Sequence, residues 1–154
     1  MCVYSLQSVR SRAAKIGDKL VTKDFRTGTR GFASAEDLTI AVCVLPGTEL
    51  AFASDVTHFG LAHNAPTASR DPLPLRLLSL IGWVPVKTQY KSAIFRQINK
   101  GDARTHHDAL EFPDGNTLLL TSLREGQQAT VLQLPAVPRN AEEAKKQERV
   151  PVLA

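Results

Sequence analysis

The chain has 154 residues, of which 43% are hydrophobic and 22% are charged, and its net charge is +4. This composition excludes a wholly disordered chain, and two cysteines are too few for a disulfide-rich scaffold. No apolar run reaches the roughly 18 residues that a membrane-spanning helix requires. The sequence therefore predicts a globular protein without a membrane span.

The first ten residues, Met-Cys-Val-Tyr-Ser-Leu-Gln-Ser-Val-Arg, differ from a secretory signal, in which basic residues precede a longer apolar stretch. Here the basic residues Arg10, Arg12 and Lys15 follow the short apolar segment. Cys2 and Cys43 belong to no CxxC or CxxH pair. We therefore expect a cytoplasmic protein whose thiols are reduced.

Apolar and β-branched runs in the first third of the chain predict four strands, over residues 3–9, 19–22, 39–45 and 48–53. Residues 39–45 are almost continuously apolar, as expected of a strand that is buried on both faces. The pair Pro46-Gly47 predicts a type II turn, after which the next strand returns. Residues 26–37 contain glycines and small polar side chains and predict a loop.

A short helix is predicted in the middle of the chain. Asp71 suits an N-cap, Pro72 the first helical position and Gly82 the stop after the helix. Only Arg76 and Ser79 would form a polar stripe on it, and so apolar a helix is usually buried. Further along, residues 90–98 fit one face of a helix and a strand equally well, and the periodicity leaves both open.

The last third predicts a three-stranded meander. Its strands are expected over residues 110–112, 117–123 and 129–134, and the turns at Pro113-Asp114-Gly115-Asn116 and Arg124-Glu125-Gly126-Gln127. The predicted fold class is β-rich α+β: a small antiparallel barrel or curved sheet with this C-terminal meander and a short helical insertion. One domain should cover residues 1–135, and residues 136–154 should form a charged, flexible tail.

The apolar segment 73–86 is the first candidate for a functional surface. It could belong to the core, contact a protein partner or a second copy of the chain, or lie at a membrane surface. Its single arginine argues against the membrane, because interfacial helices usually carry several basic residues. The residues expected to contact a partner are Leu77, Leu80, Ile81 and Trp83.

Basic residues concentrate in segments 10–30 and 76–104, which could converge on one face and attract nucleic acid or remain two separate solvated surfaces. Several of these residues alternate with aromatic side chains, as in nucleic-acid-binding barrels. The candidates for nucleic-acid contacts are Arg26, Arg30, Lys91 and Arg96.

The histidines give weak candidates for metal ligands. His58, His63 and His106 could contribute, but no HxxxH or HExxH spacing occurs. Neighbouring side chains on an extended backbone point to opposite sides, so His106 and His107 could not both bind one ion without a bend. Histidines on the surface or in turns are the simpler interpretation, and we expect no cofactor.

Three runs resemble a group of small uncharacterised bacterial proteins: Val-Tyr-Ser-Leu-Gln near the start, Thr-Gly-Thr-Arg-Gly-Phe-Ala at 27–33 and His-His-Asp-Ala-Leu-Glu-Phe-Pro-Asp-Gly at 106–115. The resemblance covers residues 1 to about 135. It implies a bacterial, cytoplasmic origin and brings no activity.

Three functional hypotheses follow. The first is a non-catalytic binding or accessory protein that contacts a protein partner or itself through segment 73–86. The alternative is a nucleic-acid-binding barrel, and the third is a small metal-dependent enzyme. The sequence contains no complete acid–base, nucleophile or metal pattern, which favours a protein that is not an enzyme.

Overall fold

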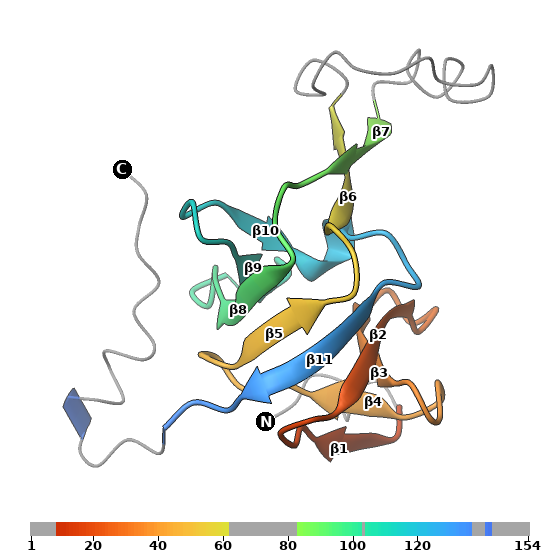
Figure 1. The fold of residues 1–154 in the computed structure, drawn as a ribbon, viewed down its shortest axis with the longest axis vertical. Coiled ribbons are helices and arrows are strands. Elements are labelled where there is room, and N and C mark those ends of the chain that lie inside the picture. The colour runs from red at the N-terminus through yellow and green to blue at the C-terminus, as the bar shows by residue number, and fades with distance from the viewer. Residues whose placement is uncertain (1–8, 62–82, 103, 137–140, 143–154) are drawn as a thin grey trace.

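The structure is a computed structural model that describes residues 9–61, 83–102, 104–136 and 141–142. Within them, eleven strands form a nine-stranded sheet and a two-stranded ribbon (Figure 1). The strands and one 3₁₀ turn are β1 (Ser11–Ala13), β2 (Lys19–Asp24), β3 (Arg30–Ser34), β4 (Ala41–Cys43), β5 (Glu49–Phe52), β6 (Thr57–Leu61), β7 (Trp83–Lys87), β8 (Ser92–Gln97), β9 (Asp108–Glu111), β10 (Thr117–Leu119), η3 (Leu120–Ser122) and β11 (Gln128–Gln133).

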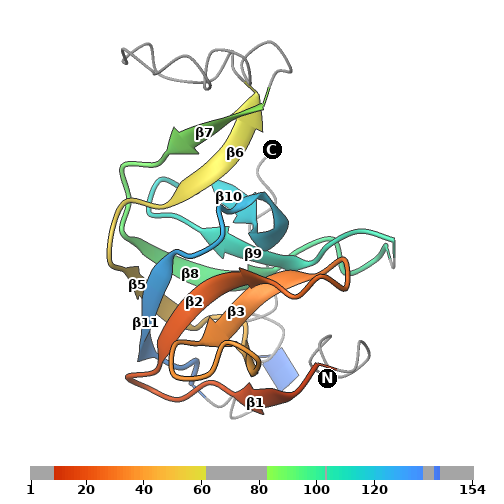
Figure 2. The ribbon, with the colours of Figure 1, turned by 90° about the vertical axis from the view of Figure 1, so that its right-hand side faces the viewer.

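The larger sheet has the strand order β1-β4-β3-β2-β11-β5-β8-β9-β10. Adjacent strands in this sheet are antiparallel, except that β1 and β4 run parallel to each other. Its first and last strands, β1 and β10, do not pair with each other among the described residues. The sheet is therefore open and mixed, and it does not close into the small antiparallel barrel that was one of the two expected forms. Strands β6 and β7 form the separate ribbon at one end of the molecule (Figures 1 and 2).

The sheet is strongly curved. The turn η3 contacts both β3 and β9, which are five places apart in the strand order. At about 4.8 Å between neighbouring strands, a flat sheet would separate them by about 24 Å, more than a three-residue turn can span. The two arms of the sheet therefore fold toward each other, with η3 between them, and the curved-sheet alternative of the sequence prediction describes the fold.

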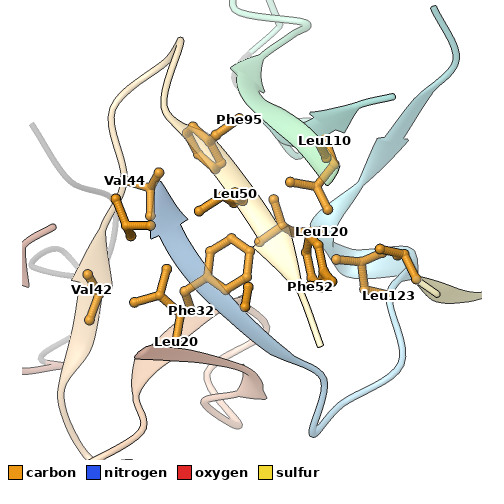
Figure 3. Close-up of a cluster of buried hydrophobic side chains, with 14 of the residues drawn as sticks. Leu20, Phe32, Val42, Val44, Leu50, Phe52, Phe95, Leu110, Leu120 and Leu123 are labelled. Carbon is orange, nitrogen blue, oxygen red and sulfur yellow. The ribbon is translucent and has the colours of Figure 1, made fainter. Parts of the chain in front are cut away.

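The concave side of this sheet encloses the hydrophobic core (Figure 3). Strand β5 shows the pattern, because Leu50 and Phe52 are buried while Glu49 is exposed. Phe32 of β3 faces Phe52 with ring centroids 6.5 Å apart. The largest fully buried side chains come from six strands and the connections that flank them: Phe32, Leu20, Leu50, Leu110, Leu123, Val42, Val56, Val131 and Thr48.

The turn at Pro46-Gly47 is confirmed, but the strands that flank it do not pair. Gly47 has φ +93°, and the Thr48 amide donates to the Leu45 carbonyl at 3.0 Å. Strand β5 pairs with β11 and β8, and β4 pairs with β3 and β1. The strand expected after the turn is present as β5, but its expected return alongside the preceding strand is wrong, because this turn carries the chain from one arm of the sheet to the other.

The prediction of a loop over residues 26–37 is wrong for residues 30–34. Residues 30–34 form strand β3, which pairs with β2 through a turn in which the Phe25 amide donates to the Thr29 carbonyl. Arg26 has φ +58° and Gly28 has φ +81°, so the glycine supplies one of two left-handed positions. The run Arg-Gly-Phe-Ala-Ser has low β propensity, and its burial between neighbouring strands overrides that preference.

The predicted meander is present only as its first hairpin. Strands β9 and β10 pair through the turn at residues 113–116, where Gly115 has φ +84°. The third strand, β11, does not join them and lies between β2 and β5. Residues 92–97 are strand β8, so the structure decides between the two interpretations of residues 90–98.

The predicted helix over residues 72–81 and residues 3–8 of the first predicted strand lie outside the described residues. In segment 73–86, the described part is extended, because Trp83 to Val86 belong to β7. Among the described residues, no helix is long and apolar enough to cross a membrane.

Cys43 is disulfide-bonded. The expectation that the thiols are reduced is therefore wrong for this residue. The sequence has one other cysteine, Cys2, which lies outside the described residues. A disulfide indicates an oxidising environment more often than a reducing one.

Replacement of Leu50 tests the central position of β5. Leu50 is fully buried, so Leu50→Ala should lower the free energy of unfolding by about 2–5 kcal/mol, through lost burial and the remaining cavity. Urea denaturation measures this loss. Leu38→Ala, at a side chain that is 44% exposed, is the control and should cost clearly less; equal losses would contradict the core assignment.

Thiol titration tests the state of Cys43. If Cys43 is oxidised, the denatured and unreduced protein should have at most one free thiol per chain, and reduction should reveal two. Two thiols before reduction would contradict the disulfide. A non-reducing gel then separates a bond within one chain from a bond between two chains.

Candidate functional site

A groove crosses the convex face of the sheet, over β11, β5, β8 and β9. The strand register places Glu49 beside Ile94, and Ile94 beside Glu111. Because side chains alternate between the two faces of a strand, these three residues form a row on the face opposite the core. Leu132 of β11 lines the same groove.

Leu132 lies at an irregularity in the sheet. The register between β11 and β5 shifts between Val131 and Gln133, so Leu132 has no direct partner on β5. Such a bulge changes the direction of a side chain and increases the local twist. Leu132 is 50% exposed although it is a large apolar residue. It therefore forms an exposed apolar side of the groove.

The turn between β9 and β10 forms the other end of the groove. Phe112, Pro113 and Gly115 line it there, and the whole groove has a volume of about 390 Å³. The ring of Phe112 stacks on that of Tyr90, with centroids 6.0 Å apart. This packing holds Phe112, just before the turn, against the segment that leads into β8.

Two carboxylates give the apolar groove an acidic character. Arg96 donates from Nε to Oε2 of Glu111 at 2.6 Å, and the two side chains are 19% and 17% exposed. Glu49 is exposed and forms no salt bridge with another described residue. The groove thus combines apolar walls with one uncompensated negative charge, which suits a ligand that is both apolar and basic.

Most of the residues expected to contact a protein partner lie outside the described residues. Leu77, Leu80 and Ile81 are outside the described residues. Trp83 is the first residue of β7 and pairs with Leu61 of β6. The residues that line the groove were not predicted as a site, although Leu132 could have been found, since it is apolar at an outward position of an alternating strand.

Of the four basic residues expected to bind nucleic acid, two form structural contacts and two are exposed. Arg30 and Arg96 are committed to structural contacts: Arg30 bonds Asp24 and the carbonyls of Thr121 and Leu123. Arg26, at the β2–β3 turn, and Lys91, just before β8, are exposed. The structure therefore does not place the four side chains as one free basic face.

The described histidines do not form a metal centre. His58 is half-buried on β6, with Nδ1 3.3 Å from the carbonyl of Phe59, and His106 is exposed. His63 lies outside the described residues. In the described part of the chain, no three His, Cys, Asp or Glu side chains come together closely enough to hold an ion.

Asp108, which follows His106 and His107, has a carboxyl group in a largely buried environment. Burial raises the pKa of Asp108, and this effect outweighs the hydrogen bond from Gln97 (3.1 Å) and the charges of His107 and His106, which lower it. His107 is itself held by a contact of 3.0 Å between its Nδ1 and the carbonyl of Ile98. Asp108 therefore weakens the folded state once it is ionised.

The pH dependence of stability tests Asp108. A raised pKa in the folded state favours folding below the ordinary pKa, and this contribution is lost as the pH rises through the raised value. Asp108→Asn keeps an oxygen for Gln97 but carries no charge. Its stability relative to the native protein should therefore rise as the pH increases from about 3 to about 7. Urea denaturation at several pH values measures this, and a constant difference would contradict the shift.

Comparisons with known proteins do not identify the chain: no protein-family model, no curated protein and no solved structure matches it.

Proposed function

We propose that this protein is a non-catalytic binding or accessory protein that acts through protein–protein contact. The observation that supports this is the groove on the convex face of the sheet, whose lining includes the half-exposed Leu132 together with Ile94 and Pro113. Apolar surface that stays in contact with water on one side of a sheet is typical of an interaction site.

The partner that fits this groove is a protein segment with apolar and basic side chains. Its apolar side chains would cover Leu132 and Ile94, and a lysine or arginine would reach Glu49. The chain as a whole has a net charge of +4, so the negative charge of the groove is a local feature. The apolar segment 73–86 remains part of the proposal as a second contact surface.

Peptide selection against the immobilised protein tests the groove. A library of random peptides should enrich sequences in which large apolar residues lie next to lysine or arginine. Leu132→Glu should abolish binding of the enriched peptides, because a buried, unpaired carboxylate would replace apolar contact. Glu49→Gln should weaken it by about twofold to fivefold, as expected for one exposed charge pair.

The matched control is Leu38→Glu. Leu38 is 44% exposed, close to the 50% of Leu132, but it does not line the groove. Peptide binding should be unchanged in this variant. If no peptides are enriched, or if both glutamate variants bind equally well, the proposed function is wrong. Light scattering on the same samples shows whether a second copy of the chain occupies the groove, since Leu132→Glu would then reduce the mass.

A further inference from the structure

A second cavity lies at the other end of β11, where the two-stranded ribbon meets the sheet. Its volume is about 620 Å³, and it shares no lining residue with the groove. Residues distant in sequence meet here: Asp55 before β6, Lys87 at the end of β7, Lys91 before β8 and Arg124 after η3. The cavity is mostly polar, unlike the apolar groove.

Three cations line this cavity. Lys87, Lys91 and Arg124 are all exposed, and none forms a salt bridge with another described residue. They differ in this from Arg30 and Arg96, whose guanidinium groups are held by Asp24 and Glu111. Three unpaired positive charges around one hollow attract an anion.

Two carboxylates also line the cavity, and one of them is engaged elsewhere. Oε1 of Glu125 accepts a hydrogen bond from the amide of Asp24 at 3.2 Å, toward the β2–β3 hairpin. Asp55 forms no salt bridge among the described residues. Even when both acids are counted, the charged residues that line the cavity sum to +1.

The backbone that carries Arg124 is held rigidly. Gln127 accepts from the amide of Thr57 at 2.6 Å and donates from Nε2 to the carbonyls of Thr57 (2.7 Å) and Arg124 (2.8 Å). The hydroxyl of Thr22 donates to the same Arg124 carbonyl, and the Arg124 amide donates to Thr57. The wall of the cavity on this side is therefore a closed hydrogen-bond network.

The segment that carries the two lysines is also fixed. The Thr88 amide, next to Lys87, donates to the Val56 carbonyl at 2.8 Å, and the Val56 amide donates to the Tyr90 carbonyl. The Lys91 carbonyl accepts from the Phe52 amide at 2.6 Å. All three cations thus start from backbone that is anchored to neighbouring elements, which lowers the cost of bringing them to one ligand.

We propose that this cavity is a binding site for the phosphate groups of a small anionic molecule. Arg124 can present two donors to a phosphate, and the lysines contribute positive charge. Ser54 and Gln128 also line the cavity, and both residue types can form hydrogen bonds with a phosphate. The volume is in the usual range of about 300–1,000 Å³ for small-molecule sites.

Isothermal titration calorimetry with inorganic pyrophosphate tests this site. Binding should weaken as salt rises from about 50 mM to about 200 mM, because the attraction is electrostatic. Lys87→Gln, Lys91→Gln and Arg124→Gln should each weaken it by about threefold to fivefold, and the triple variant should abolish it. Asp55→Asn should strengthen it, because the substitution removes a repelling charge.

Lys15→Gln is the matched control. It also removes one exposed lysine, but from the turn before β2, at the opposite end of that strand from Asp24. It should leave binding unchanged, and thermal unfolding of every variant verifies that the fold is intact. The proposal is overturned if pyrophosphate does not bind, or if the cavity variants and Lys15→Gln have equal affinity.

A short single-stranded oligonucleotide separates the two sources of phosphate. A site for a small molecule should bind the oligonucleotide no more tightly than pyrophosphate, and Arg26→Gln should have no effect on either. Tighter oligonucleotide binding that also depends on Arg26 would overturn the small-molecule assignment in favour of a nucleic-acid surface. None of these outcomes depends on the groove, so the two proposals fail or succeed separately.

Discussion

Strand β11 joins the two arms of the sheet, and the remainder of the fold depends on its two sets of hydrogen bonds. On one side it pairs with β2, where Ala129 lies opposite Leu20, and on the other with β5, where Ala129 lies opposite Phe52. Ala129 and Val131 are both buried, so the strand contributes to the core as well as to the ladder. Without it, the arms β1-β4-β3-β2 and β5-β8-β9-β10 would each have a second unpaired edge, at β2 and at β5.

Both candidate sites are also consequences of where β11 lies. At its C-terminal end, the register shift against β5 places Leu132 on the convex face, beside the row of Glu49 and Ile94. Just before its N-terminal end, Gln127 connects the β11 backbone to β6 and to Arg124. One strand therefore borders an apolar, acidic groove at one end and a polar cavity rich in cations at the other.

The ion pairs show which basic side chains hold the fold together and which have no acidic partner among the described residues. Arg30 bonds Asp24 and two carbonyls near η3, and so ties the β2–β3 hairpin to the turn that fills the curved sheet. Arg96 pairs with Glu111 across β8 and β9. Arg30 lies in the basic segment 10–30 and Arg96 in the basic segment 76–104. The net charge of a segment does not distinguish such paired arginines from cations without a partner. Partners on neighbouring strands decide which arginines can meet a ligand.

The sequence by itself determined the local features, because these depend on residues close together in the chain. The glycines at positions 47 and 115 adopt the positive φ that their turns require, and residues 41–43 and 49–52 form strands. Tertiary structure decided which strands pair, since Thr22 and Arg124, 102 residues apart, meet only in the folded chain. It also made β3 a strand against its propensity and assembled the groove and the cavity. Such pairings depend on burial and register across the whole sheet, which local patterns do not encode.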